Sequence, residues 1–285
     1  MSWTNYHGHC KFCDGHGQIE EYIQQAIKNN MKAIGISCHA PVPFDCFWTM
    51  KPDDVDDYLQ QIQELKLKYQ SNIHVYTSLE IDYIPGITGP DHPILSDINL
   101  DYKIGSIHFV DKFKNGTPWP IDGSFDEFTK GLDEIYNGDI KTAVQRFFQL
   151  NREMINTQSF DIIGHFDKIK MHNVTKPLFD ENADWYLREV NDTLDCIASK
   201  NIIVEINTKL YERNGLLFPG VELFPKLLEK EISVTINSDA HYPDKLEIGY
   251  EYVAGELRKA GFKTLKEFVN GNWTDVEFNK YGLLW

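Results

Sequence analysis

The sequence contains no long apolar run, although 42% of its 285 residues are hydrophobic. A helix that crosses a bilayer needs roughly 20 consecutive apolar residues, and no segment approaches this length. The first residues are polar, aromatic and histidine-containing, which is not the layout of a secretory signal peptide. We therefore expect neither a membrane protein nor a secreted one, and a cytoplasmic location.

Cysteine is scarce and shows no disulfide framework. The chain has five, an odd number: Cys10, Cys13, Cys38, Cys46 and Cys196. Free thiols in a reducing compartment are the simplest interpretation. Cys10 and Cys13 form a C-x-x-C pair, but no second pair completes a cysteine-rich zinc site. A thioredoxin-like pair would stand at a helix N-terminus after a strand, so this motif alone gives little support for redox chemistry.

Basic residues are outnumbered, with 28 Lys and Arg against 43 Asp and Glu and a formal net charge of −15 at pH 7. Nucleic-acid binding requires clustered Lys and Arg against the phosphate backbone, so we expect no nucleic-acid partner. A small anionic substrate stays compatible with this charge, because several divalent cations in one pocket reverse the local field. Repeats, low-complexity stretches and Gly/Ser linkers are also missing, so we predict one domain over residues 1–285.

Short apolar runs alternate with longer segments of helical period, which is typical of βα units. Several of the runs are nearly continuous, as expected of buried parallel strands. The predicted strands cover residues 3–9, 32–38, 73–81, 102–109, 160–166, 202–207 and 232–238. The predicted helices cover 19–27, a segment that opens at Pro52, 139–157, 183–200, 221–231 and 244–260. This order predicts an α/β fold, a barrel of βα units.

The segment 110–138 is different, because it is rich in glycine and proline and shows no sustained period. A connection this long inside a barrel is more often a lid or substrate loop than a plain connection. We predict a substrate loop or lid here, with a decorated surface loop as the alternative.

Histidines and carboxylates gather at the ends of the predicted strands. Six of the ten histidines stand there together with two carboxylates: His7, His9, His39, His108, His165, His241, Glu80 and Asp239. A single histidine in such a place is more often a hydrogen-bonded structural residue. So many polar rings would be costly to bury without partners, and imidazole with carboxylate is a normal shell for zinc, iron or manganese. The pattern therefore predicts a metal site at the carboxyl ends of the strands.

Eight candidate ligands exceed the needs of one ion, because a catalytic zinc takes three protein ligands and keeps one position open. The count predicts two or three divalent transition-metal ions. Glu80 is the predicted bridge, since its carboxylate offers two oxygens where an imidazole ordinarily binds through one nitrogen. Clusters with ions about 3.5–4 Å apart are typical of phosphoryl-transfer and hydrolysis sites, so we predict a multi-metal phosphomonoesterase with a small phosphorylated substrate.

These motifs resemble the PHP (polymerase and histidinol phosphatase) superfamily. The resemblance runs from residue 1 to about residue 250 and rests on His7-x-His9, Asp14-Gly15, His39, Glu80, G-S-I-H of 105–108, G-H of 164–165 and D-A-H of 239–241. C-D-G-H-G-Q-I-E-E-Y of 13–22 and G-S-I-H-F before the long loop are similar to the monofunctional histidinol-phosphatases. The resemblance implies a distorted (βα)7 TIM-like barrel, in agreement with the seven predicted strands. It also implies hydrolysis of L-histidinol phosphate to L-histidinol and phosphate in histidine biosynthesis.

The resemblance further implies a trinuclear site. One ion would take His7, His9, Glu80 and Asp239, a second Glu80, His108 and His165, and a third Asp14, His39 and His241. The ligand near position 14 has an alternative in His16, because some relatives use histidine near there. The Asp-Gly pair favours Asp14.

The predicted catalytic residues are Glu80, as the bridge, together with Asp239 and His241. Either of the latter two, or a metal-bound water, could protonate the leaving alkoxide. The predicted substrate-binding residues are Ser106, Arg213, Lys170 and Glu21. Arg213 and Lys170 would stabilise charge on the phosphate oxygens. Glu21 would bind the substrate amine or imidazole; the alternative is that it is a first-turn carboxylate of a helix. Phe113 and Trp119 could supply an aromatic wall.

Three other functions fit parts of the pattern. The nearest is a PHP-type phosphoesterase acting on another small phosphorylated metabolite. An amidohydrolase-type deaminase also opens with H-x-H, but that family usually has eight strands and often a bridging carboxylated lysine where this chain has Glu80. A non-catalytic metal-binding module is opposed by the complete ligand set. The sequence does not indicate the metal or the oligomeric state.

Overall fold

Seven parallel strands form the centre of the molecule in a computed structural model that describes residues 2–96 and 98–285. Their order in the sheet is β1-β2-β3-β4-β7-β8-β9. The bounds are β1 Thr4–Asn5, β2 Ala33–Ile36, β3 His74–Asp82, β4 Tyr102–Ser106, β7 Ile162–Ile163, β8 Ile203–Asn207 and β9 Val234–Asn237. All seven of the predicted strands are present, and each neighbouring pair is parallel.

The sheet closes at its carboxyl end between the first and last strands. Gly8 and Ala240 form a parallel bridge there. The amide of His9 donates to the Ala240 carbonyl at 2.9 Å, and the amide of Ala240 donates to the His7 carbonyl at 3.2 Å. The closure is made by few bonds, so the barrel is distorted, as the prediction of a (βα)7 barrel requires.

Two of the strands are much shorter than predicted, and the chain bends sharply directly after two of the strands. β1 and β7 each have two residues. After β7 the backbone of His165 adopts φ = 28°, and after β9 that of Asp239 adopts φ = 48°. Positive φ is uncommon for such residues and concentrates at functional sites. The bends end the strands and leave both side chains at the barrel mouth.

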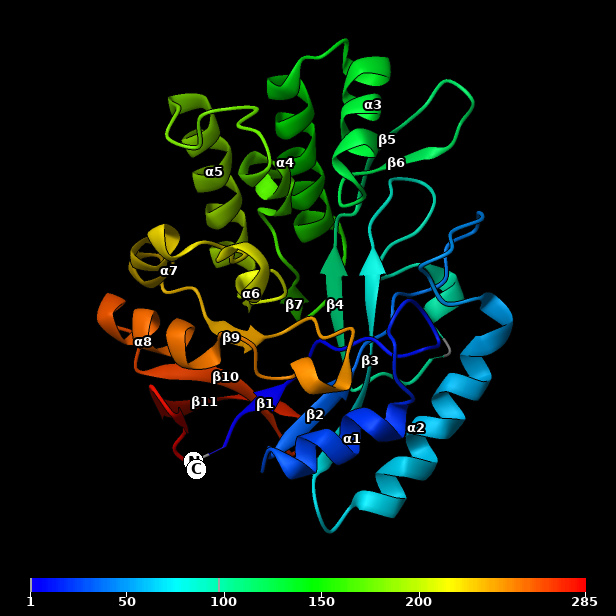
Figure 1. The fold of residues 1–285 in the computed structure, drawn as a ribbon, viewed down its shortest axis with the longest axis vertical. Helices are drawn as coiled ribbons and strands as arrows, with labels where there is room; N and C mark the ends of the chain where they lie inside the picture. The colour runs from blue at the N-terminus through cyan, green and yellow to red at the C-terminus, as the bar shows by residue number, and fades with distance from the viewer. Residues whose placement is uncertain (1, 97) are drawn as a thin grey trace.

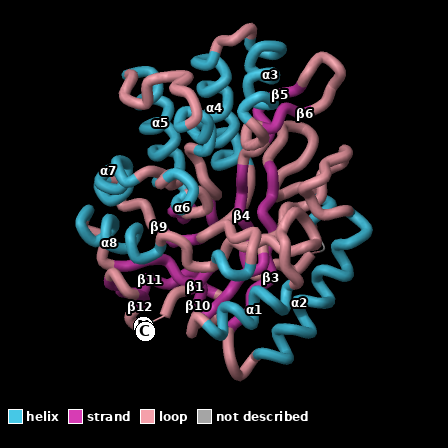
Figure 2. The backbone as a smooth tube through the Cα atoms, in the orientation of Figure 1, coloured by secondary structure: helices cyan, strands magenta, loops and turns pink. Residues whose placement is uncertain are grey.

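Helices cover the outside of the barrel (Figures 1 and 2). They are α1 Ile19–Lys28, α2 Val55–Tyr69, α3 Phe125–Tyr136, α4 Ile140–Thr157, α5 Asp184–Lys200, α6 Tyr211–Asn214, α7 Phe224–Glu229 and α8 Tyr250–Ala260. Short 3-10 helices cover Pro52–Asp54, Pro93–Leu95, Lys168–Val174, Val221–Leu223 and Pro243–Lys245. The face of α1 predicted from its periodicity is buried, and Gly261 ends α8 with a positive φ. None of the helices within residues 2–96 and 98–285 is long and apolar enough to cross a membrane.

The segment 110–138 is more regular than the sequence indicated. Most of it consists of a hairpin, β5 Phe109–Lys112 and β6 Pro118–Pro120, followed by α3. Ser124 begins α3 in a capping box, in which the Ser124 amide donates to Glu127 at 2.8 Å and the Glu127 amide donates to Ser124 Oγ at 3.2 Å. The glycines and prolines of the segment thus concealed regular structure, and the role of the segment as a substrate loop or lid stays a prediction.

An antiparallel sheet that the sequence analysis did not anticipate closes the other end of the barrel. It consists of β10 Thr264–Val269, β11 Asn272–Asn279 and β12 Gly282–Leu283. Aromatic rings from this sheet, Phe268 and Trp273, pack against Tyr6 and Tyr102 of the barrel. Aromatic side chains therefore fill much of the amino end of the barrel, whereas the polar strand-end residues lie at the carboxyl end.

Candidate metal centre

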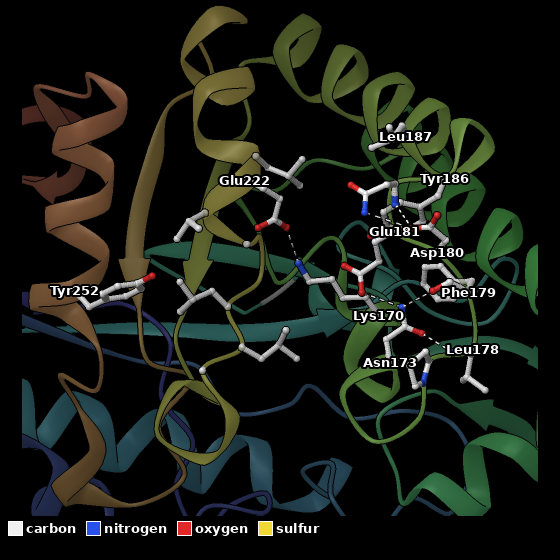
Figure 3. A pocket seen from close by; sticks show the side chains of 18 residues that line it. Lys170, Asn173, Leu178, Phe179, Asp180, Glu181, Tyr186, Leu187, Glu222 and Tyr252 are labelled. Carbon is white, nitrogen blue, oxygen red and sulfur yellow. Dashed lines mark hydrogen bonds and ion pairs between the residues drawn. The ribbon is translucent and has the colours of Figure 1, made fainter.

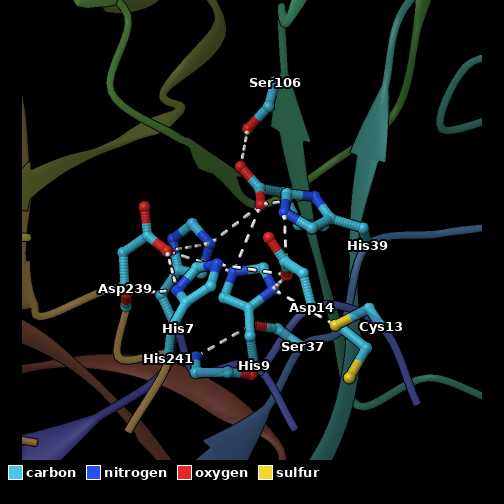
Figure 4. A network of polar contacts seen from close by, with 12 residues as sticks. His7, His9, Cys13, Asp14, Ser37, His39, Ser106, Asp239 and His241 are labelled. Carbon is cyan, nitrogen blue, oxygen red and sulfur yellow. Dashed lines mark hydrogen bonds and ion pairs between the residues drawn. The ribbon is translucent and has the colours of Figure 1, made fainter. Parts of the chain in front are cut away.

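The carboxyl ends of the strands bring nine predicted ligands into one cluster. Figure 4 labels His7, His9, Asp14, His39, Asp239 and His241 among them. The residues are His7, His9, Asp14, His39, Glu80, His108, His165, Asp239 and His241. Seven of them have at most 5% of their surface exposed, whereas Asp14 and His241 are partly exposed at the edge. The structure therefore brings together the residues that the sequence analysis assigned to one site.

Glu80 lies in the middle of the cluster. Its Oε2 atom lies 3.1 Å from both His7 Nε2 and His39 Nδ1, and 3.4 Å from His9 Nε2. Its Oε1 atom lies 2.8 Å from His165 Nε2. Burial raises the pKa of Glu80, but the charges of His7 and His39 outweigh burial and hold the pKa well below its usual range. The carboxylate is thus ionised and has the central position expected of a bridge.

Two carboxylates complete the cluster on the side of β9. Asp239 Oδ1 lies 3.1 Å from His9 Nε2, and Asp14 Oδ1 lies 3.1 Å from His241 Nε2. His16 is exposed instead, and its ring stacks on Tyr242 at 4.2 Å. The geometry therefore favours Asp14 over His16 as the ligand near this position.

The donor atoms of the cluster fit cations. Among the described residues, His7 Nε2, His9 Nε2, His39 Nδ1, Glu80 Oε2 and Asp14 Oδ1 are buried without a hydrogen-bond partner. Buried polar atoms of this kind are rare and costly, and several here converge on the same space. Ligand atoms lie within 4.8 Å of one another in three groups: His9-Asp14-His39-His241, His7-His9-Asp239 and His39-Glu80-His108.

These groups divide the ligands slightly differently from the division that the family resemblance implied. His9 joins Asp14, His39 and His241 in one group, and His39 also joins Glu80 and His108 in another. His165 stands outside the three groups and contacts Glu80 directly. The number of groups is nevertheless the number of ions that the resemblance implied.

Carboxylates behind the cluster hold two of the imidazoles. His7 Nδ1 lies 2.6 Å from Glu205 Oε1, and His108 Nδ1 lies 3.0 Å from Asp82 Oδ1. Such partners fix the tautomer and orientation of a metal-binding histidine. The sequence analysis assigned no role to Glu205 or Asp82. Burial lowers the pKa of His7, but Glu205 and Glu80 outweigh it and raise the pKa well above its usual value.

Two lysines stand at the open side of the cluster, and both were missed. Lys168 Nζ lies 3.0 Å from Asp122 Oδ2 and 3.2 Å from His108 Nε2. Lys209 Nζ lies 3.2 Å from both Asp239 Oδ1 and His241 Nε2. Both lysines, Asp122 and Asp239 line a cavity of about 600 Å³ whose wall also includes Arg213. Positive charge therefore faces the cavity next to the predicted ligands.

The structure does not bring Lys170 to the cluster. Its Nζ lies 2.7 Å from Asp167 and 3.5 Å from Glu222, and it lines a separate cavity of about 800 Å³ (Figure 3). The reason is the 3-10 helix Lys168–Val174. With three residues per turn, positions 168 and 170 point in different directions, and Lys168 is the one at the site.

Two other predicted substrate-binding residues, Glu21 and Ser106, form hydrogen bonds within the protein. The Gln18 amide donates to Glu21 at 2.7 Å in the capping box that begins α1, so the helix alternative holds for Glu21. Ser106 is fully buried and donates to Glu80 Oε1 at 2.7 Å, which orients the carboxylate.

Trp119, which was predicted to form an aromatic wall for the substrate, does not lie beside the cluster. Trp119 is fully buried against α3. The aromatic ring beside the cluster is that of Trp48, 4.7 Å from the ring of His39 and 5.4 Å from that of His108. No sequence signal distinguished Trp48, because it lies in an irregular loop after β2.

Comparison with known proteins places this cluster in context. A model of the PHP domain matches residues 5–209. A Deinococcus radiodurans protein named "Probable histidinol-phosphatase" is 26% identical over 91% of this chain and 94% of its own length. The Bacillus subtilis "Histidinol-phosphatase" is 23% identical over 89% of this chain and 98% of its own length.

Two solved structures share the fold. A Listeria monocytogenes protein superimposes with a TM-score of 0.75 at 19% identity, over 87% of this chain and 99% of that one. The histidinol phosphate phosphatase of Lactococcus lactis gives a TM-score of 0.69 at 17% identity, over 96% of this chain and 99% of that one. At these identities the likeness concerns the fold.

Proposed function

This chain belongs to the PHP domain family, and we propose that it is a metal-dependent phosphomonoesterase that hydrolyses L-histidinol phosphate to L-histidinol and phosphate. The observation that carries the proposal is the cluster of nine candidate ligands around Glu80. Curated relatives of nearly the same length are named histidinol-phosphatases. A role in histidine biosynthesis and a cytoplasmic location are parts of the same proposal.

The nine clustered residues would hold two or three divalent ions, which can be zinc, iron or manganese because all three accept imidazole and carboxylate ligands. The Lactococcus lactis neighbour was solved with zinc, L-histidinol and phosphate. Bound ions would neutralise phosphate charge and lower the pKa of water from about 15.7 to about 7. The buried acceptor atoms of Glu80 and Asp14 would then be satisfied.

The side chains at the cavity would bind the phosphate and hold it in place. Lys168 and Lys209 carry positive charge next to His108 and Asp239, where the equatorial oxygens of a phosphate need compensation. An ion pair between Asp122 Oδ2 and Lys168 Nζ, 3.0 Å long, holds the lysine in position. Arg213, at the wall of the same cavity, adds charge at its entrance.

Asp239 and His241 serve as ligands rather than as proton donors in this proposal. Burial and the charge of Lys209 lower the pKa of His241, so its imidazole is neutral at pH 7. Burial raises the pKa of Asp239, but Lys209 and His7 outweigh it and hold the pKa well below its usual range. Neutral imidazole and ionised carboxylate are the forms that bind metal.

The test is a substrate panel. Purified protein would be reconstituted with zinc, manganese or iron(II) in turn, and kcat/KM measured for L-histidinol phosphate, a sugar phosphate, a nucleoside monophosphate and a phosphodiester. We expect the highest value for L-histidinol phosphate by about 100-fold or more, as a site that pairs substrate polar groups can achieve. A higher value for another monoester would show instead a PHP-type phosphoesterase with a different substrate. Inactivity on the whole panel would contradict the proposal.

A further inference from the structure

Three cysteines lie directly behind the metal ligands, and the proposed function does not use them. Cys10 and Cys38 are fully buried, and Cys13 is partly exposed. The Sγ atoms of Cys10 and Cys38 lie 3.2 Å apart. Cys13 Sγ lies 3.5 Å from His9 Nδ1, and Figure 4 shows it beside Asp14. The closest thiols are therefore not the two of the C-x-x-C motif.

Cys10 and Cys38 meet because neighbouring strands carry them. β1 and β2 are paired in parallel; Cys10 directly follows His9 beyond β1, and Cys38 directly precedes His39 beyond β2. The Cys10 amide also donates to Cys38 Sγ at 3.3 Å. Each of the two cysteines is thus the immediate chain neighbour of a predicted metal ligand.

We propose that Cys10 and Cys38 are an oxidisable thiol pair, a modification site at which a disulfide weakens metal binding. The oxidant would be a small peroxide, of which hydrogen peroxide is the simplest. It oxidises one thiol to a sulfenic acid and releases one water. The second thiol attacks that sulfur, the S–S bond forms, the S–O bond breaks and a second water leaves. Two thiols lose two protons and two electrons, and one peroxide becomes two waters.

The disulfide would disturb the ligands because of its length. An S–S bond is about 2.05 Å, so the sulfur atoms, now at 3.2 Å, must approach by about 1 Å. Metal sites tolerate errors of about 0.2 Å in ligand distance. We expect the backbone segments that carry His9 and His39 to take up part of this movement. Metal affinity would fall by about 10- to 100-fold, the range found when supporting groups of a metal site are altered.

The experiment uses the full chain loaded with zinc, because zinc itself has no redox chemistry. Protein would be treated with hydrogen peroxide, denatured, and analysed by thiol titration and by mass spectrometry of its peptides. Retained zinc would be measured on the folded sample before and after addition of a dithiol reductant. We expect a Cys10–Cys38 disulfide, a zinc affinity lower by 10- to 100-fold, and recovery of affinity on reduction.

Two variants make the result specific. Cys38→Ala should retain its zinc affinity under peroxide, whereas Cys196→Ser, altered at a half-buried thiol on α5, should respond like the unmodified protein. A disulfide between Cys13 and Cys38, no disulfide at all, or a Cys10–Cys38 disulfide with unchanged zinc affinity would each overturn the proposal. The ligand effect rests on the proposed metal site, but the peptide and zinc measurements need no substrate. A failure of the proposed phosphatase activity would therefore be distinguishable from a failure of the thiol proposal.

Discussion

Glu80 contacts more side chains of the cluster than a carboxylate that binds one metal ion would. Four imidazole nitrogens lie within 3.4 Å of its two oxygens, and Ser106 fixes its orientation. Removal of its charge should therefore affect every ion of the site together.

For Glu80→Gln we expect metal content and turnover to fall together, because an amide cannot bridge cations as a carboxylate does. Elemental analysis and kcat/KM on L-histidinol phosphate would measure both, with an expected loss of at least about 100-fold in kcat/KM. Glu64→Gln, at an exposed carboxylate of α2, is the control and should leave both unchanged. Unchanged turnover in Glu80→Gln would remove Glu80 as the bridge.

Glu205 acts on the site through His7. Its carboxylate lies 2.6 Å from His7 Nδ1 and also accepts from Asn207 at 2.9 Å and from Asn237 at 3.1 Å. We expect Glu205→Gln to lower metal affinity by about 10- to 100-fold with little change in kcat at saturating metal. Titration of apo protein with zinc would measure the affinity. An equal loss of kcat at saturating metal would show that Glu205 does more than orient the imidazole.

The clustering of the candidate ligands was predictable from sequence, because strands that end together place the residues that follow them close together. The lysines and aromatics around them were not. Lys168 and Lys170 point in different directions because both lie on a 3-10 helix, and the apolar pattern does not reveal this helix. The position of Trp48 depends on an irregular loop, whose path is set by tertiary contacts.

At the scale of elements, α3 depends on close contact with the hairpin before it. A Cβ atom on Gly131 would lie 2.0 Å from Trp119 Nε1, inside a fully buried ring. The sequence presented this glycine as a sign of a loop, whereas its function is to let a helix approach an indole. The capping box at Ser124 was the local signal that could have corrected the interpretation.

Gly131→Ala should therefore lower the free energy of unfolding by about 1–3 kcal/mol, the usual cost of overpacking a core. Urea denaturation would measure it. Gly255→Ala in α8 is the matched control, because its added Cβ meets nothing within 4 Å among the described residues. That variant should be neutral or more stable by up to about 1 kcal/mol. Equal behaviour of the two variants would contradict the packing argument.

The sheet β10–β12 was missed because it is not part of a βα unit, the pattern from which the other strands were read. It places Glu267 inside the closed end of the barrel, where Thr4 Oγ1 and the Tyr6 hydroxyl donate to it at 2.6 and 2.8 Å. Burial raises the pKa of Glu267 to about 7 from its ordinary 4.5, although the hydrogen bonds of Thr4 and Tyr6 oppose this.

The raised pKa makes stability depend on pH. Between about pH 4.5 and 7 the folded chain keeps a proton that the unfolded chain releases, so the contribution of Glu267 to stability is lost as pH rises. At 1.36 kcal/mol per pKa unit the loss is about 3 kcal/mol. Because Glu267→Gln keeps the neutral form, its unfolding free energy relative to the unmodified chain should rise by up to that amount between pH 4.5 and 8.

Urea denaturation at both pH values, in chelator, would measure this difference. Glu251→Gln, at an exposed carboxylate of α8, is the control and should show no comparable change. A Glu267→Gln difference that stays constant with pH would show that the carboxyl group titrates normally in the folded chain.

For the whole molecule, bound metal should contribute to stability, because its ligands come from strands all round the barrel. At a free metal concentration 100 times the dissociation constant, binding stabilises by about 2.7 kcal/mol. For a chain of this size that is a rise in Tm of about 5 °C or more. Calorimetry with zinc and with a chelator would measure the rise, and Glu80→Gln should show little of it. Identical Tm values for the unmodified chain would contradict metal binding at this site.

The barrel is closed by its first and last strands, and the bond from the Tyr6 amide to Asn237 joins residues 231 positions apart. The same closure brings His7 and His9 beside Asp239 and His241. At 5–20 residues per second of synthesis, on the order of ten seconds or more separates the appearance of these two ligand sets at the ribosome. We therefore expect the proposed site to capture metal only after β9 has been translated.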